Sequence, residues 1–169
     1  MAAIFVPILI ITGWIGSYSF ITQSGSTVRL RIEGYDPRDL LAGHYLRYRV
    51  NYGDNIECPA NDQGEGTSWC LCLDQKNGKF SQVSSQGSCD EFSDCRAGMI
   101  KGTCKSQRFE AGIERFYFAE ENQKLLKLVP PESSIIVALS PAGKGVVKDL
   151  MVGEVPLATW IEEQNQQEK

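Results

Sequence analysis

Apolar and polar residues alternate along several short stretches of the chain, and a period of two residues is typical of half-buried β-strands. In residues 28–32, Val28, Leu30 and Ile32 alternate with two arginines. In residues 44–50, one face carries His44, Leu46, Tyr48 and Val50, and the other carries Tyr45, Arg47 and Arg49. The same reasoning predicts further strands at residues 68–73, 79–83, 112–118, 135–139 and 146–152. The pattern therefore predicts a mainly β domain, a small sandwich or a partly open barrel.

One or two short helices are expected beside the strands. Asp36 is a good N-cap, Pro37 fits the first helical position, and Gly43 suits the left-handed residue that ends a helix. These residues predict one or two helical turns over residues 36–43. A second short helix is predicted over residues 119–128, where the two prolines that follow stop it.

Turns and loops connect the predicted strands. Asn77-Gly78 is a strong hairpin signal, because both residues accept a positive φ. Ser140 to Gly145 predicts a second turn between two strands. Residues 51–67 and 84–111 are polar and rich in glycine and serine, so we expect long loops there.

Residues 2–21 contain no charged side chain. Twenty helical residues span about 30 Å, the thickness of the hydrocarbon core of a bilayer, so residues 1–22 are predicted to form a transmembrane anchor. A cleaved signal peptide and a buried core helix are the alternatives. We expect a linker at 23–27, one β-rich domain at 28–161 and a flexible tail at 162–169.

Six cysteines follow the apolar stretch, and an even number in this position indicates disulfides in an oxidising compartment. They are Cys58, Cys70, Cys72, Cys89, Cys95 and Cys104. Cys70 and Cys72 share one face of a strand, so we expect each to pair with another cysteine. Free thiols and a zinc or iron–sulfur site are the alternatives, although the spacings differ from the usual zinc pairs.

Composition argues against several classes of function. Lys plus Arg is 17 and Asp plus Glu is 21, which gives a net charge of −4 and argues against a nucleic-acid binder. A single histidine leaves little room for a histidine-rich metal site or a Ser/His/Asp triad. The glycines around Lys144 lack the frame of a phosphate-binding loop. We therefore expect no cofactor and no metal.

Residues 34–48 resemble the GDYXXLXY family of small, membrane-anchored bacterial proteins. Residues 36–43, with the sequence DPRDLLAG, match the segment that precedes the family motif, and residues 115–120 and 145–150 match two later segments. His44, Tyr48 and Val50 stand where the motif has Asp, Leu and Tyr. The resemblance implies a location at the membrane and an integral membrane protein as partner, and it implies no catalysis.

Two groups of residues are candidates for a binding surface. The first is a polar interaction motif that consists of Asp36, Pro37, Arg38, Asp39, Gly43, His44, Tyr45, Arg47 and Tyr48. The alternative is that these residues only cap, turn and pack. The second is a basic face made by Arg29, Arg31, Arg47 and Arg49. It would meet anionic lipid headgroups near the anchor, or it is a solvated strand face.

These observations predict a non-catalytic accessory module, attached to the plasma (inner) membrane by one helix. The cysteines place its domain outside the cytoplasm, in the periplasm or at the cell exterior. The arginines after the apolar stretch, taken alone, favour the opposite orientation. The alternative function is a membrane-tethered Ser/Lys hydrolase resembling signal peptidases, with Ser24 or Ser26 as nucleophile and Lys76 or Lys79 as base.

Overall fold

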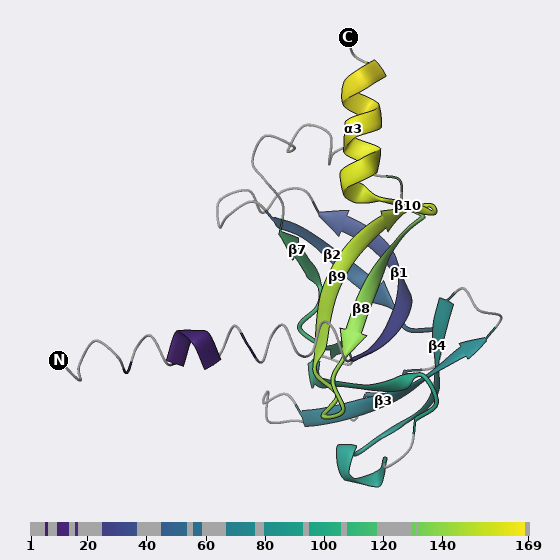
Figure 1. Cartoon of the computed structure of the whole chain (residues 1–169). Coiled ribbons are helices and arrows are strands. Elements are labelled where there is room, and N and C mark those ends of the chain that lie inside the picture. Colours follow the sequence, from purple (N-terminus) through teal and green to yellow (C-terminus); the bar gives the residue numbers. More distant parts are fainter. Residues whose placement is uncertain are drawn as a thin grey trace.

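The computed structural model describes most of the chain from residue 25 onward and a few residues before it. The described residues are 6, 10–13, 16, 25–36, 45–53, 56–58, 67–76, 80–92, 95–105, 108–117, 130 and 132–167. Within them, ten strands form two antiparallel sheets, and helical turns are few (Figure 1). The prediction of a mainly β protein is confirmed.

The larger sheet has six strands and contains both early and late segments of the chain. Its order is β10 (Val155–Pro156), β9 (Gly145–Val152), β8 (Ser133–Leu139), β1 (Ser26–Asp36), β2 (Tyr45–Asn51) and β7 (Arg115–Tyr117). β1 pairs with β2 on one side and with β8 on the other, with Leu30 opposite Ile135. The strands predicted at 28–32, 135–139 and 146–152 are therefore confirmed, as is the described part, residues 45–50, of the strand predicted at 44–50.

The smaller sheet has four strands, in the order β4 (Phe80–Gly87), β3 (Thr67–Lys76), β5 (Gly98–Lys105) and β6 (Arg108–Glu110). A single 3₁₀ turn, η1 (Cys89–Glu91), follows β4. In Figure 1, β3 runs crosswise below the lower ends of β8 and β9. The helix α3 (Leu157–Gln167) extends from the opposite end of the larger sheet.

The two sheets share one hydrophobic core. Leu30 and Ile135 of the larger sheet and Leu71, Leu73 and Ile100 of the smaller sheet are all fully buried in the same cluster. The alternation predicted from the sequence sets the inward face, since Val28 and Ile32 beside Leu30 are also buried. Burial of each such side chain stabilises the fold by about 2 kcal/mol, so this core fixes how the sheets meet.

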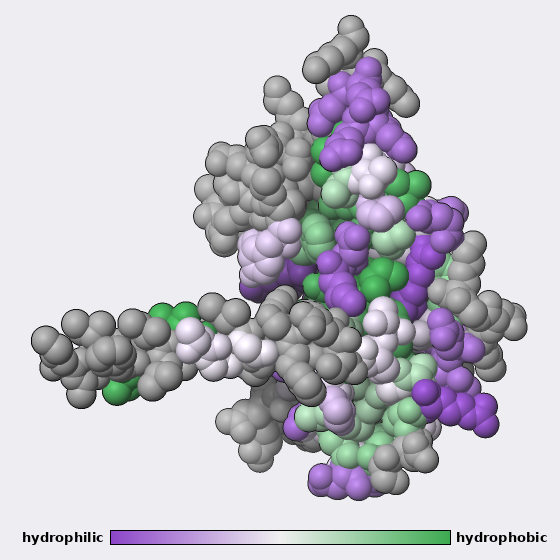
Figure 2. Space-filling view, in the orientation of Figure 1, coloured by the Kyte–Doolittle hydropathy of each residue, from purple (hydrophilic) through white to green (hydrophobic). Residues whose placement is uncertain are grey.

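Two segments contain more regular secondary structure than the sequence predicts. Residues 84–111 are not one long loop, because they contain the end of β4 and all of β5 and β6. β5 has two glycines and few β-branched residues, yet it lies between β3 and β6 and inserts Ile100 into the core. The tail predicted at 162–169 is helical up to Gln167, because α3 continues to that residue, and its flexibility stays a prediction. Figure 2 shows hydrophilic residues covering the outer part of this helix.

Little of the apolar N-terminal stretch is described. Residues 10–13 are helical and lie apart from the two sheets (Figure 1). Val6, Ile10 and Ile11 are 57, 64 and 55% exposed, and hydrophobic surface is visible on this stretch in Figure 2. Among the described residues, no helix has the length and apolar character needed to span a bilayer. The helices predicted at 36–43 and 119–128 lie outside the described residues, except for Asp36, which is the last residue of β1.

Candidate functional site

All six cysteines form disulfides, which confirms the first of the three alternatives. The pairs are Cys58–Cys104, Cys70–Cys89 and Cys72–Cys95, with Cα–Cα distances of 5.5, 4.9 and 5.3 Å. As expected, Cys70 and Cys72 do not pair with each other. Since every cysteine sulfur is bonded to another, the chain has no free cysteine to act as a thiolate ligand or nucleophile.

Two of the disulfides, Cys70–Cys89 and Cys72–Cys95, cover the outer face of β3. Leu71 and Leu73 point into the core, so Cys70 and Cys72 point to the other face, where a strand next to the core would otherwise meet solvent. Both cysteines are buried, and each is bonded to a cysteine that follows β4, Cys70 to Cys89 and Cys72 to Cys95. The Ala97 amide also donates a hydrogen bond of 3.0 Å to the Leu73 carbonyl. This face of the smaller sheet is therefore closed by the chain itself.

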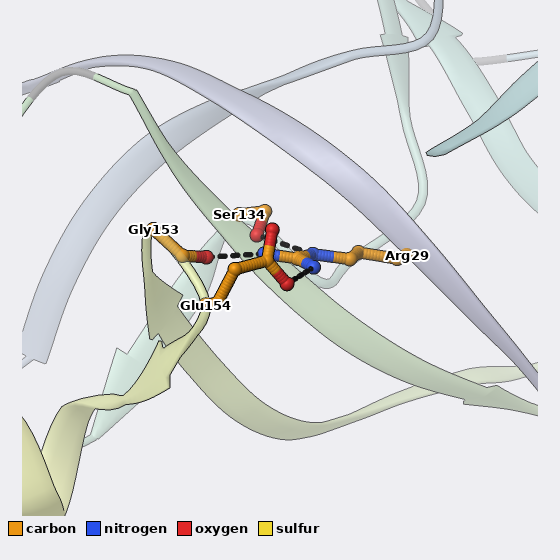
Figure 3. A network of polar contacts seen from close by, with 4 residues as sticks. All are labelled: Arg29, Ser134, Gly153 and Glu154. Carbon is orange, nitrogen blue, oxygen red and sulfur yellow. Dashed lines mark hydrogen bonds and ion pairs between the residues drawn. The ribbon is translucent and has the colours of Figure 1, made fainter. Parts of the chain in front are cut away.

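Arg29 is held in a polar network on the larger sheet (Figure 3). Its side chain, 14% exposed, donates hydrogen bonds to Ser134 Oγ at 2.9 Å, to Glu154 Oε2 at 2.8 Å and to the Gly153 carbonyl oxygen. Ser134 belongs to β8, whereas Gly153 and Glu154 form the turn between β9 and β10. Arg29 thus joins the centre of the sheet to the turn that precedes α3.

The other arginines of the predicted basic face lie near aromatic or acidic residues. The guanidinium carbon of Arg31 lies 4.4 Å from the centre of the Phe80 ring, and that of Arg29 lies 5.1 Å from it. Arg49 is exposed and lies opposite Glu33 in the β1–β2 ladder. The structure confirms that β1 and β2 pair, but Glu154 forms an ion pair with Arg29 and Glu33 lies opposite Arg49. Its binding to lipid stays a prediction.

A second surface lies where β2 pairs with β7. Tyr45 is directly opposite Tyr117, and Arg47 is directly opposite Arg115. The Tyr45 and Tyr117 rings are 5.8 Å apart, and the Arg115 guanidinium carbon lies 5.2 Å from the centre of the Tyr45 ring. Tyr117 is 68% exposed, and both arginines are exposed. We call these four residues the Tyr–Arg surface.

Buried contacts beneath the Tyr–Arg surface fix the position of β7. Leu46 of β2 lies opposite Phe116 in the core-facing layer. The Tyr48 hydroxyl donates a hydrogen bond of 2.5 Å to the Ile113 carbonyl, and the Tyr48 amide donates one of 3.2 Å to the Glu114 carbonyl. Burial, followed by the negative charge of Glu114, raises the pKa of Tyr48 far above its usual value. Tyr48 is therefore a neutral structural residue.

Tyr52 is the second buried phenol in this region. Its ring meets the Phe109 ring edge-on at 5.3 Å. Burial is the main cause that raises the pKa of Tyr52, with smaller effects from Glu114 and Tyr48. Its hydroxyl has no hydrogen-bond partner among the described residues, so an ionised Tyr52 would be a buried charge without compensation, which is more costly than the same charge in water. Neither tyrosine is suited to act as a general base.

Only part of the predicted interaction motif is described. Tyr45 and Arg47 contribute to the Tyr–Arg surface, whereas Tyr48 faces the core. The backbone of Asp36 ends β1 opposite Arg47. Pro37, Arg38, Asp39, Gly43 and His44 lie outside the described residues. Sequence reasoning missed Arg115 and Tyr117 as site residues, although the predicted strand at 112–118 contains both.

The residues of the predicted Ser/Lys site are only partly described. Ser26 begins β1 opposite Leu139, and its side chain lies beside Gly98. Ser24, Lys79 and the side chain of Lys76 lie outside the described part of the chain. The hydrolase alternative stays a prediction. In the described part of the chain, no three His, Cys, Asp or Glu residues are grouped so that they could bind a metal ion.

The fold and the site define a disulfide-bonded, two-sheet β protein with an exposed tyrosine and arginine surface at one side of its larger sheet. The model of the family described as GDYXXLXY protein matches residues 7–150, so the chain belongs to the GDYXXLXY family. No curated protein and no solved structure matches the chain.

Proposed function

We propose that this protein is a non-catalytic accessory module attached to the plasma membrane by residues 1–22. In this proposal its β-domain lies on the outer side of the membrane and works with an integral membrane protein. The observation that carries the proposal is the set of three disulfides within one domain. Such bonds persist in oxidising compartments and are rare in the cytosol of most cells.

Two features support attachment to the membrane. Residues 2–21 have no charged side chain and are long enough, as a helix, to cross the hydrocarbon core. Val6, Ile10 and Ile11 are largely exposed, and exposed apolar side chains next to one another are unfavourable in water. A bilayer would bury them. Because Arg29 and Arg31 are fixed within the folded domain, they give little information on orientation.

A role in binding rather than catalysis fits the chemistry of the described residues. The cysteines are all bonded, and the two buried tyrosines have raised pKa values. The Tyr–Arg surface instead presents the two residue types that contribute most to protein interfaces, together with tryptophan. It lies on a strand pair held from beneath by Tyr48.

We also propose a finer description of the fold, as a partly open barrel. The Val83 amide of β4 donates a hydrogen bond of 3.4 Å to the Tyr52 carbonyl, just after β2. At a second place, the Lys101 amide of β5 donates a hydrogen bond of 2.8 Å to the Gly143 carbonyl in the β8–β9 turn. These bonds connect the two sheets at two places around the shared core.

Fractionation of cells that produce the full-length protein tests the location. The protein should remain in the membrane pellet after alkaline carbonate washing. In intact spheroplasts, a membrane-impermeant maleimide should label the six cysteines only after reduction. Recovery from the cytosol, or labelling of six thiols without a reductant, contradicts the proposed location.

Purification of the full-length protein in a mild detergent tests the partner. An integral membrane protein should elute with it during size exclusion, and the complex should persist at moderate dilution. A protein that elutes alone and monodisperse contradicts the proposed accessory role. A mock purification from cells that do not produce the protein is the control, since it shows which membrane proteins elute at the same volume on their own.

A further inference from the structure

We infer that the Tyr–Arg surface is a carboxylate-binding site whose occupant is an acidic segment of a protein partner. The inference rests on the proposed function only for the identity of that partner. The site itself follows from Arg47 and Arg115, which lie directly opposite each other, and from the tyrosine pair next to them.

The opposed arginines have an energetic cost that an anion would remove. Like charges directly opposite in a ladder are destabilising, and a strand pair without function would gain from an acid at one of these positions. Within the described part of the chain, neither Arg47 nor Arg115 makes an ion pair. Arg115 contacts the face of the Tyr45 ring, which orients its guanidinium group without neutralising it.

The surroundings favour a carboxylate. A guanidinium group donates two parallel hydrogen bonds that match the geometry of a carboxylate, and two opposed groups can hold two acidic side chains or both oxygens of one. The protein as a whole has a net charge of −4, so this surface is a local positive region on an acidic molecule. Acidic chains would therefore bind at this surface in preference to the rest of the molecule.

A protein segment fits the surface better than lipid headgroups. Lipid-binding patches usually gather four to eight basic residues. On the larger sheet the arginines do not form such a patch, because Arg29 is bonded to Glu154. In the β1–β2 ladder, Glu33 and Asp36 also lie opposite Arg49 and Arg47. The exposed Tyr117 ring and the Tyr45 ring beside it provide a flat apolar contact for the side chains that flank an acidic residue.

A direct binding measurement tests the site. The full-length protein in a non-ionic detergent is titrated into a fluorescein-labelled, amidated hexaglutamate peptide at low salt, and fluorescence anisotropy is recorded. Wild type should bind, and the double variant Arg47→Gln/Arg115→Gln should bind about tenfold more weakly or worse. The matched control Arg49→Gln removes an exposed arginine from the same face of β2 and should change affinity less than about twofold. Thermal unfolding checks that all variants remain folded.

Each outcome decides the inference. Equal affinity of wild type and the double variant, an equal loss in Arg49→Gln, or no binding to wild type overturns it. Dihexanoyl phosphatidylglycerol, a soluble anionic lipid, serves as competitor. If it displaces the labelled peptide at concentrations as low as unlabelled hexaglutamate, the occupant is a lipid and the inference is overturned.

The same variants separate this inference from the proposed function. If a membrane partner co-purifies with wild type but equally well with Arg47→Gln/Arg115→Gln, the carboxylate site is wrong and the accessory role stands. If no partner co-purifies but hexaglutamate binding depends on Arg47 and Arg115, the site stands and the accessory role is wrong.

Discussion

The hydroxyl of Tyr48 donates a hydrogen bond of 2.5 Å to the carbonyl of Ile113, and both residues are only 2% exposed. This bond joins β2 to the residues that lead into β7. The sequence separation between the two residues is 65, so the contact forms only when distant parts of the chain meet. It holds in place the strand that carries Arg115 and Tyr117.

Replacement of Tyr48 by phenylalanine should lower the free energy of unfolding by about 2 kcal/mol, because the buried Ile113 carbonyl loses its donor. Urea unfolding measures the change, and the m-value should stay the same. Tyr117→Phe is the matched control. Since Tyr117 is 68% exposed, this variant should change stability by less than about 0.5 kcal/mol. Equal effects of the two variants would contradict the role assigned to Tyr48.

The buried phenols predict a loss of stability at alkaline pH. The pKa values of Tyr48 and Tyr52 are raised in the folded protein, so above about pH 10 the unfolded chain loses these protons first. The stability from these two groups is fully present below pH 10 and falls by about 1.4 kcal/mol per pH unit for each tyrosine above it. Tyr48→Phe should reduce that slope by about half. Urea unfolding at several pH values from 9 to 11 measures it, and a slope that is unchanged in the variant would disprove this assignment.

The network around Arg29 predicts unequal effects of its two charged members. Arg29→Met should lower the free energy of unfolding by about 2 kcal/mol, because the hydroxyl of the buried Ser134 loses its donor, whereas the exposed Gly153 carbonyl can bind water instead. Glu154 is 63% exposed at its side chain, so Glu154→Gln should cost less than about 1 kcal/mol. Thermal unfolding of both variants at low and high salt measures the difference. A larger loss in Glu154→Gln would mean that the ion pair, and not the neutral acceptors, fixes Arg29.

Gly143 connects the β8–β9 turn to β5 and should not tolerate a side chain. Its φ is +80°, and a Cβ there would lie 3.1 Å from the Lys101 Cβ and 3.1 Å from the Met99 Cε. Gly112 has a φ of +78°, and a Cβ there would meet no atom within 4 Å. We expect Gly112→Ala to cost about 1 kcal/mol from backbone strain alone and Gly143→Ala to cost about 2 kcal/mol or more. Urea unfolding compares them, and equal costs would show that the contact between the sheets is not tight.

The disulfide with the longest loop should contribute most to stability. Cys58 and Cys104 are 46 residues apart, against 19 and 23 for the other two pairs. In the chain-entropy model, loops of these lengths correspond to about 4 and about 3 kcal/mol. Removal of the pair in Cys58→Ala/Cys104→Ala should lower the free energy of unfolding by about 4 kcal/mol. A loss below about 1 kcal/mol would contradict this estimate.

The connectivity itself is open to a direct measurement. Unreduced protein is digested under denaturing conditions with chymotrypsin, which can cut at Leu71 between Cys70 and Cys72 and at Phe92 between Cys89 and Cys95. Mass spectrometry should then find the linked peptides that contain Cys70 with Cys89 and Cys72 with Cys95. The exchanged pairs would contradict the structure.

The alternation of apolar and polar residues predicts those strands that have one buried and one exposed face. Val28, Leu30 and Ile32 alternate with arginines because β1 has a core on one side, and that contrast is visible in the sequence. The disulfides were also predictable, because six cysteines gather in one stretch. β5 could not be predicted in this way, because its glycines and lysines do not alternate with apolar residues. Its position in the sheet depends on pairing with β3.

The candidate site could likewise be predicted from the sequence only in part. Tyr45 and Arg47 could be selected because they stand together in a short polar motif. That Arg115 lies opposite Arg47 depends on the register between β2 and β7, which the bonds from Tyr48 to Ile113 and Glu114 set. No local property of residues 115–117 specifies that their partners lie 68 to 72 residues earlier in the chain.

The position of β1 has a consequence for how the protein matures. This strand follows directly after the apolar stretch, yet one of its two neighbours is β8, which is synthesised more than 90 residues later. Until β8 arrives, one long edge of β1 has unpaired amide and carbonyl groups that can pair with other chains. Synthesis that stops short of β8 therefore leaves a polypeptide with an open, aggregation-prone edge, and quality control has a clear feature by which to distinguish it from the finished domain.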